Sequence, residues 1–209
     1  MHFWLRVGQT LMAKRPLDPP GPVTDSLTLA TKSATGDKAA YGALMRQWQQ
    51  PLWRIAKRYT GDAGESEDIV QEVFVAFWRT LTKPESGDSS IPRDVGAFLR
   101  RATLNACRDW SRRRAVRAFF FAAIPFDPAR DQATPQLDPN GQTNDLETLE
   151  LLIAQLPTGL KGPLILCALE GLGQKEAAVV LGLSQKAVEA RVARAKQMLR
   201  KNWPIAPTM

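Results

Sequence analysis

Cysteine and histidine are scarce in this chain of 209 residues, which holds two cysteines and one histidine. Cys107 and Cys167 stand in no CxxC or metal-ligand spacing, and His2 lies at the extreme N-terminus. The pattern therefore excludes a disulfide framework and a zinc site, and we expect no metal. Each cysteine falls within an apolar helical pattern, which favours a small buried hydrophobic residue over a redox sensor.

Long apolar runs and catalytic patterns are missing as well. No stretch approaches the roughly 20 apolar residues that a membrane helix needs, so we expect no membrane insertion. The two unpaired cysteines favour a reducing compartment, so we expect a cytoplasmic location. Lys14 and Arg15 follow the apolar start of the chain, which is the wrong order for a signal peptide. There is no glycine-rich phosphate loop. We therefore expect no catalytic residues and no cofactor.

What the chain does have is an excess of positive charge, with 28 basic and 21 acidic residues and a net charge of +7. That excess favours a polyanionic partner. The stretch 122–145 holds four prolines and four aspartates and no helical period, and no segment alternates like a strand. We predict an all-α fold of two small helical domains joined by an extended linker. The expected segments are a flexible leader at 1–24, with Met12 as an alternative translation start, a domain at 25–115, a linker at 116–145 and a second domain at 146–203.

Four helices are predicted in the first domain, and the first three lie before residue 82. Asp37 is expected to cap a helix that follows it, and Pro51 to begin a second helix that stops at Gly61. In the third, residues 67–81, apolar side chains fill one half of the helical wheel. The other half carries Asp68, Gln71 and Glu72. This polar stripe is either a solvated face or a surface for a basic partner helix, because carboxylates and an amide suit arginine.

An arginine-rich helix is predicted next, at residues 97–114. Seven arginines lie between positions 100 and 117 against the single Asp109. Such a density of charge repels itself unless phosphates or another polyanion neutralise it. Interleaved apolar residues keep one face of the helix apolar, so it is no disordered tail. Nucleic acid is the preferred partner, while a solvated helix or a membrane surface remain alternatives.

The second domain has the pattern of a helix-turn-helix. Ala178 is small where two helices must approach, Gly182 falls in the turn, and Ser184 can cap the second helix. Val188 and Val192 are expected to anchor that helix inward. Its outer face gives residues 185–201 a net charge of +5. A recognition helix of this kind places its N-terminal part in the major groove of DNA.

Taken in order, these motifs resemble the sigma factors of bacterial RNA polymerase, in the short extracytoplasmic-function class of the sigma-70 family. The resemblance covers roughly residues 26–115 and 146–202. It rests on Glu67-Asp68-Ile69-Val70-Gln71-Glu72-Val73-Phe74, on Phe98-Leu99 through Asn105 and Asp109 to Arg112-Arg113, and on Leu156-Pro157 with Glu170-Gly171-Leu172 and Gln174-Lys175-Glu176-Ala177-Ala178. No single motif is specific, but three in this order are.

The resemblance implies a promoter-specificity subunit of core RNA polymerase that promotes melting without catalytic activity of its own. It implies contacts with the beta-prime coiled coil and the beta flap, with promoter DNA, and with an anti-sigma factor that holds the protein silent. The loop at 82–96 and the arginine-rich helix would engage the minus-10 element. The implied residues are Asp68, Gln71 and Glu72 for core polymerase; Arg100, Arg101, Asn105, Arg108, Arg112 and Arg113 for the minus-10 element; and Lys186, Glu189, Ala190, Arg191 and Arg194 for the minus-35 element.

The sequence departs from the family pattern in two places. Glu189, Ala190 and Ala193 stand where many relatives have basic, Ser or larger side chains, which suggests an unusual DNA specificity. Gly159, Gly162 and Pro163 replace the usual polar helix formers, so we expect that helix to start late, near Pro163. Two other functions stay open on the residues alone: an autonomous helix-turn-helix regulator that binds duplex DNA as a dimer, and an adaptor that binds proteins.

Overall fold

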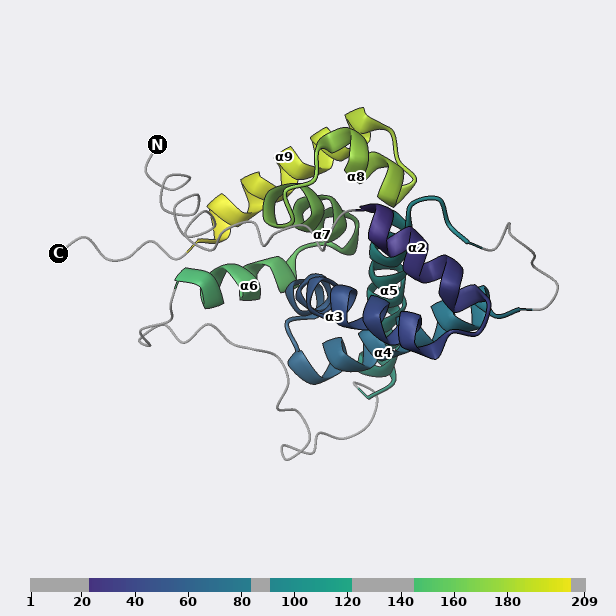
Figure 1. The fold of residues 1–209 in the computed structure, drawn as a ribbon. Coiled ribbons are helices and arrows are strands. Elements are labelled where there is room, and N and C mark those ends of the chain that lie inside the picture. Colours follow the sequence, from purple (N-terminus) through teal and green to yellow (C-terminus); the bar gives the residue numbers. More distant parts are fainter. Residues whose placement is uncertain (1–22, 84–90, 122–144, 204–209) are drawn as a thin grey trace.

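The structure, a computed structural model, describes residues 23–83, 91–121 and 145–203. Every element within these residues is helical, which confirms the all-α fold class. The predictions for the leader at 1–24 and for the linker at 116–145 fall largely outside the described residues. Figure 1 shows two groups of helices, with α8 and α9 lying on one side of the α2 to α5 group.

The first group contains α2 (Val23–Ala34), α3 (Lys38–Thr60), α4 (Ala63–Leu81) and α5 (Val95–Phe121). Helix α3 packs against α2, α4 and α5, so it is the centre of the group. Its start is fixed by Asp37, whose carboxylate accepts hydrogen bonds from the N–H groups of Ala39 and Ala40 at 2.9 and 3.0 Å. Gly61 ends the helix with φ of 79°, as predicted.

The predicted break at Pro51 is wrong, because α3 runs through it as one helix. Proline removes one hydrogen bond and strains the preceding turn, which is a local penalty. The side chains of Trp48 and Leu52 on either side of it are buried in the core, at 4% and 0% exposure. Tertiary packing of α3 thus outweighs the local signal. Helix α5 continues to Phe121, past residue 115, the predicted end of the first domain.

The second group contains α6 (Asp145–Gln155), α7 (Thr158–Leu164), the π-helical turn η2 (Ile165–Leu169), α8 (Gln174–Leu181) and α9 (Gln185–Asn202). The expectation that the helix after Pro157 starts late, near Pro163, is wrong. Helix α7 begins at Thr158 and Pro163 lies inside it, just before η2. Proline supplies no N–H to the carbonyl four residues earlier. The π-helical turn η2 follows, in which the Glu170 N–H donates to the Ile165 carbonyl at 2.9 Å.

The helix-turn-helix is confirmed in detail. Gly182 ends α8 with φ of 64°, and the Ser184 hydroxyl accepts a hydrogen bond from the Ala187 N–H at 3.2 Å to begin α9. Val188 and Val192 are buried.

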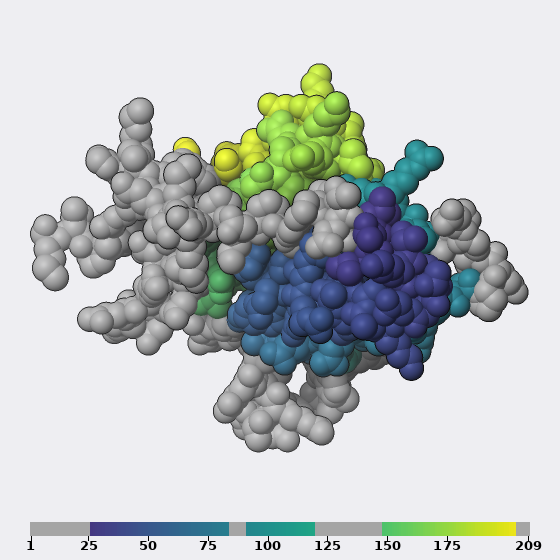
Figure 2. Space-filling model, viewed as in Figure 1, coloured from purple at the N-terminus to yellow at the C-terminus, as the bar shows by residue number. Residues whose placement is uncertain are grey.

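The two groups of helices share one apolar core. Helix α3 contacts α6 and η2, and α5 contacts α7 and α8. Figure 2 shows the second group lying directly over the first along one face of the molecule. We call these contacts between residues 26–119 and 148–203 the interdomain contact. Leu104 and Cys107 of α5 are buried within this core, and burial raises the pKa of the Cys107 thiol to about 12. Cys107 is therefore a small buried hydrophobic residue as expected, whereas Cys167 is only partly buried.

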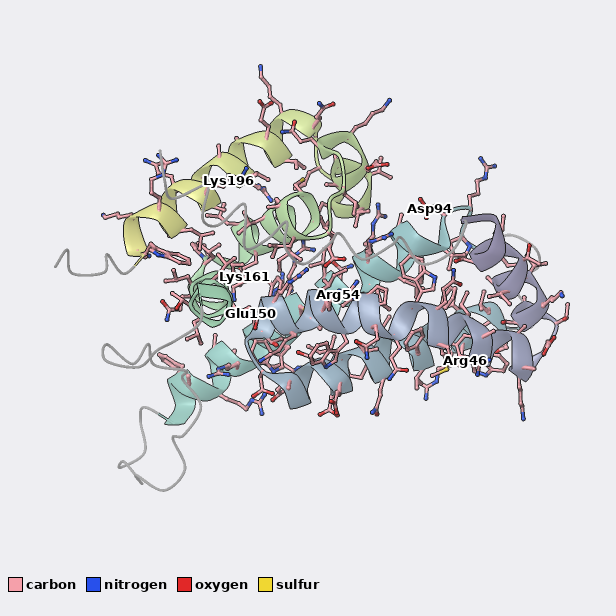
Figure 3. All side chains as sticks on the ribbon, turned by 60° about the vertical axis from the view of Figure 1, so that its left-hand side comes forward. Arg46, Arg54, Asp94, Glu150, Lys161 and Lys196 are labelled. Atoms are coloured by element: carbon pink, nitrogen blue, oxygen red, sulfur yellow. The ribbon has the colours of Figure 1, made fainter. Side chains whose placement is uncertain are left out.

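A buried lysine lies in the interdomain contact. Lys161 of α7 is 5% exposed, and its ammonium group donates to the backbone carbonyls of Tyr59 in α3 (3.0 Å) and Ala154 in α6. The same group lies 4.9 Å from the centre of the Tyr59 ring. Figure 3 shows Lys161 at the junction between the two groups. Burial lowers the pKa of Lys161 from 10.5 to about 8, with Cys107 opposing and Arg114 adding to the shift.

The Lys161 pKa predicts a pH dependence of stability. Below pH 8 the ammonium is charged in both the folded and the unfolded chain, so folding bears the full cost of burying the charge. Between pH 8 and 10.5 the unfolded chain binds more protons, so the free energy of unfolding contributed by this site rises with pH. The slope is at most about 1.4 kcal/mol per pH unit.

Urea unfolding of the wild type and of Lys161→Met between pH 7.5 and 10 checks this. The difference in unfolding free energy between the two proteins should grow in favour of the wild type as the pH rises, while Lys57→Met, which removes a partly exposed lysine of α3, should track the wild type. The difference isolates Lys161 because the thiol of Cys107, which acts in the opposite direction above pH 9, is present in both proteins. Parallel curves for wild type and Lys161→Met would contradict the prediction.

Candidate functional site

The first candidate surface is the acidic stripe of α4, formed by Asp68, Gln71 and Glu72. All three residues are exposed, and none forms an ion pair or side-chain hydrogen bond with another described residue. Turning by about 100° per residue, the same helix buries its opposite face in the core, with Ile69, Val70, Val73, Phe74 and Phe77 at 4% exposure or less. The sequence pattern predicted the buried and the exposed face of α4 correctly.

The acidic stripe is held in place by rigid packing beneath it. The carboxylate of Asp62 accepts from the Glu65 N–H at 3.0 Å and fixes the start of α4. Val75, on the same face as the stripe, is 49% exposed. The surface therefore offers two carboxylates, an amide and an apolar contact in a fixed array, which suits a basic helix with apolar positions.

The second candidate surface is the α5 arginine surface, formed by Arg100, Arg101, Asn105, Arg108, Arg112 and Arg113. The structure places these six residues on one helix but in different environments. Asn105, Arg112 and Arg113 are exposed. Arg112 lies 3.4 Å from Asp109, in a pair whose side chains are 79% and 61% exposed, so the pair adds little stability. The Arg108 guanidinium donates to the Asn105 amide oxygen at 2.7 Å.

At the N-terminal end of the α5 arginine surface, Arg100 is engaged within the protein. Its guanidinium lies 4.9 Å from the centre of the Trp48 ring of α3, a cation–π contact. Gly96, one turn earlier, makes room for this ring, since a Cβ there would lie 2.6 Å from it. Burial lowers the pKa of Arg100, with Glu170 opposing the shift, and the guanidinium stays protonated.

Arg101 is also engaged, although it is exposed. Its guanidinium donates to the backbone carbonyls of Val180, at 2.8 Å, and Val179. These carbonyls belong to the last turn of α8, where the helix dipole favours a positive charge. Neither engagement follows from the sequence pattern. The loop at 82–96 that was expected to act with this surface falls partly outside the described residues, at 84–90.

The third candidate surface is the α9 face, formed by Lys186, Glu189, Ala190, Arg191 and Arg194. All are exposed except Arg191, which is partly buried. The face begins in the first turn after the Ser184 cap, at the end of α9 that would enter a DNA groove. Helix α8 packs beneath it through Ala177 and Ala178. The arrangement presents three lysine or arginine side chains and one acceptor on a single helix.

Sequence reasoning missed the residues that join the two groups of helices. Arg58 of α3 pairs with Glu170, which follows η2, at 2.5 Å, and the two side chains are 20% and 9% exposed. Burial lowers the pKa of Arg58, while Glu170 opposes that shift. Arg58 and Glu170 are separated by 112 positions, so no local period reports the pair. Lys161 alone could have been noticed from the sequence, because it is a charged residue within the apolar run GLKGPLIL.

The described residues show no cluster of three or more His, Cys, Asp or Glu side chains that could hold a metal ion. Among the same residues, no helix combines the length and the apolar character required to cross a membrane.

Two family matches cover most of the described chain. Residues 44–117 match Sigma-70 region 2, and residues 146–199 match Sigma-70, region 4. The first match contains the acidic stripe and the α5 arginine surface, and the second contains the α9 face.

Curated relatives agree with the family matches. The chain is 34% identical over 178 residues to the RNA polymerase sigma factor CnrH of Cupriavidus metallidurans, covering 82% of this chain and 90% of the relative. It is 30% identical over 179 residues to the ECF RNA polymerase sigma factor SigE of Mycolicibacterium smegmatis, covering 82% of this chain and 65% of the relative.

The chain is also similar to solved structures of sigma factors. The structure of CnrH in complex with the cytosolic domain of CnrY matches with a TM-score of 0.60 and 30% identity, covering 85% of this chain and 96% of that one. The sigma factor RpoE in complex with the anti-sigma factor NepR from Bartonella quintana matches in fold, with a TM-score of 0.57 and 17% identity over 77% of this chain and 94% of that one. The chain therefore belongs to the sigma-70 family, as an alternative RNA polymerase sigma factor of the extracytoplasmic-function class that directs transcription from promoters.

Proposed function

We propose that this sigma factor binds core RNA polymerase through the acidic stripe of α4, and promoter DNA through the α5 arginine surface and the α9 face. The observation that carries the proposal is the acidic stripe. Its three polar side chains are exposed and unpaired among the described residues, on a helix whose other face is fixed in the core. A face that contacts only water does not require two carboxylates and an amide in one cluster. A surface for a basic partner helix does.

The two DNA surfaces divide the recognition of a promoter between them. The α9 face reads the minus-35 element as duplex, with Glu189 able to accept from the N4 amino group of cytosine and Ala190 limited to methyl contact. The α5 arginine surface holds the melted minus-10 strand through phosphate contacts. Extruding a base from the stack costs a few kcal/mol, and contacts of this kind offset that cost without nucleotide hydrolysis. The protein needs no catalytic residue of its own for this role.

An anti-sigma factor is the third proposed partner, and the cytoplasm, where the polymerase acts, is the proposed location. The proposal of an anti-sigma factor is supported by a structure of similar fold, since the RpoE structure contains the anti-sigma factor NepR. A protein of this kind would bind the same exposed acidic stripe or α9 face that polymerase and DNA require. Competition between the anti-sigma factor and core polymerase for the sigma factor would then hold transcription silent.

The acidic stripe gives the first functional prediction. Asp68→Ala combined with Glu72→Ala should weaken binding to core RNA polymerase by at least about 10-fold, because two charge-assisted hydrogen bonds are lost at a positively charged partner. Fluorescence anisotropy with labelled sigma factor and purified core, without DNA, measures the affinity. Circular dichroism should show unchanged helix content, since both side chains lie outside the core.

A matched variant separates the acidic stripe from net charge. Asp109→Ala combined with Glu189→Ala removes the same charge from exposed positions on α5 and α9, and its affinity for core should equal that of the wild type. Equal weakening in both double variants, or none in either, would contradict the assignment of Asp68 and Glu72.

The α9 face gives a prediction about salt. Arg194→Ala should weaken binding of the holoenzyme to promoter duplex and reduce the slope of log affinity against log salt by about one, because one phosphate contact and its counterion are lost. Arg46→Ala, which removes an exposed arginine of α3 far from α9 (Figure 3), should leave the slope unchanged. A wild-type slope in Arg194→Ala would show that this side chain is merely solvated.

A further inference from the structure

Asn105, an exposed residue of the α5 arginine surface, has its side-chain amide held in one orientation. The Arg108 guanidinium, about one turn further along the helix, donates to the Asn105 side-chain oxygen at 2.7 Å. A guanidinium carries only N–H donors and no acceptor, so the amide atom that faces it has to be the oxygen. The NH2 group of Asn105 therefore points away from Arg108, and it donates to none of the described residues.

Arg108 is itself held against the first group of helices. Its side chain is partly buried, whereas that of Asn105 is exposed. Burial raises the pKa of the Tyr59 hydroxyl in α3 to about 12, and the charge of Arg108 opposes that rise, which places the guanidinium near α3. Asn105 and Arg108 both belong to α5, so the hydrogen bond between them does not require the second group of helices.

The other pair with the same spacing on this helix is looser. Arg112 lies 3.4 Å from the carboxylate of Asp109, and both side chains are largely exposed. Solvent screens such a pair, so the Arg112 guanidinium is available to a phosphate. The α5 arginine surface thus contains two kinds of arginine. Arg112 and Arg113 carry exposed charge, whereas Arg108 uses one of its donors to orient a neighbouring amide.

An amide fixed in this way distinguishes between the edges of unpaired bases. A free asparagine side chain pairs with adenine by using its oxygen and its NH2 group together. With its oxygen turned toward Arg108, Asn105 offers its donors to the strand. On the Watson–Crick edge, cytosine has two adjacent acceptors, O2 and N3, whereas guanine has two adjacent donors, and adenine and thymine each mix donors with acceptors. Cytosine therefore suits the NH2 group best.

We propose that Arg108 is a positioning residue for base selection: it holds the oxygen of the Asn105 amide and turns the NH2 group toward the melted strand, so that an unpaired cytosine is preferred there. This inference rests on the proposed function of the α5 arginine surface. Arg112 and Arg113 bind phosphates whatever the base sequence, because phosphate contacts carry no base information. Asn105 selects the base, and Arg108 determines which edge of the base Asn105 accepts.

Base preference, rather than total affinity, is the quantity to measure. The probes are short fluorescent strands of thymine that carry one central cytosine, guanine or adenine, with the all-thymine strand as reference. Because the strand slides on the protein, a preferred base sets its own register. Fluorescence anisotropy gives the affinity of the holoenzyme for each probe, and core polymerase alone shows which part of the binding does not come from the sigma factor. The readout is the ratio of each affinity to that of the reference.

The wild type should bind the cytosine probe about 10-fold more tightly than the reference, because a fixed polar group rejects a base that leaves it unpaired. Arg108→Ala should lower this ratio to about 1, because the amide is then free to rotate. Arg108→Lys, which keeps a cation with donors only, should retain most of the ratio. Arg112→Ala is the matched control, since it should weaken binding of every probe equally and leave the ratio unchanged.

Asn105→Asp tests the orientation directly by reversing the chemistry of the group that meets the base. The aspartate keeps its pair with Arg108 but presents an acceptor to the strand, so the preferred probe should change from cytosine to guanine while total affinity falls. A role of Arg108 in packing alone predicts no such exchange. Circular dichroism establishes that each variant is folded; should Arg108→Ala fail to fold, Arg108→Lys and Asn105→Asp decide.

Three outcomes would overturn the positioning role: a wild-type ratio in Arg108→Ala, an equal loss of ratio in Arg112→Ala, or a continued preference for cytosine in Asn105→Asp. A ratio of about 1 in the wild type would overturn base selection by Asn105. If the holoenzyme bound none of the strands beyond the level of core polymerase, the proposed function of the α5 arginine surface would be rejected instead.

Discussion

The density of positive charge on α5 is the constraint on which the rest of the structure depends. Seven arginines within 18 positions repel one another unless a partner of opposite charge or a compensating contact is supplied. The free chain supplies such contacts internally: an aromatic ring of α3 lies under Arg100, and the carbonyl end of α8 receives Arg101. Of the arginines farther along the helix, Arg112, Arg113 and Arg117 are exposed, whereas Arg108 and Arg114 are partly buried. Arg100 thus ties α5 to α3 within the first group, and Arg101 ties α5 to the second group of helices.

These internal contacts are of a kind that can be exchanged. An arginine held by backbone carbonyls or an aromatic face loses little when a phosphate replaces them, because the guanidinium remains paired throughout. Lys161 is different, since its only described hydrogen-bond acceptors are two neutral carbonyl groups, and its buried charge works against the closed arrangement at neutral pH. The interdomain contact therefore combines favourable pairs with one unfavourable charge. The polar part of this contact, which lies beside the shared apolar core, is typical of an interface between two domains.

Local signals predicted the parts of the structure that local chemistry controls. Asp37, Gly61 and Ser184 begin or end helices where the sequence indicated, and the apolar half of α4 is buried while its polar half is exposed. The two wrong predictions both concern proline: Pro51 lies inside α3, and Pro163 inside α7. In each case burial of neighbouring side chains outweighs a local penalty. The pairing of Arg58 with Glu170 lay beyond prediction for another reason, since it joins elements 112 positions apart and leaves no periodic trace.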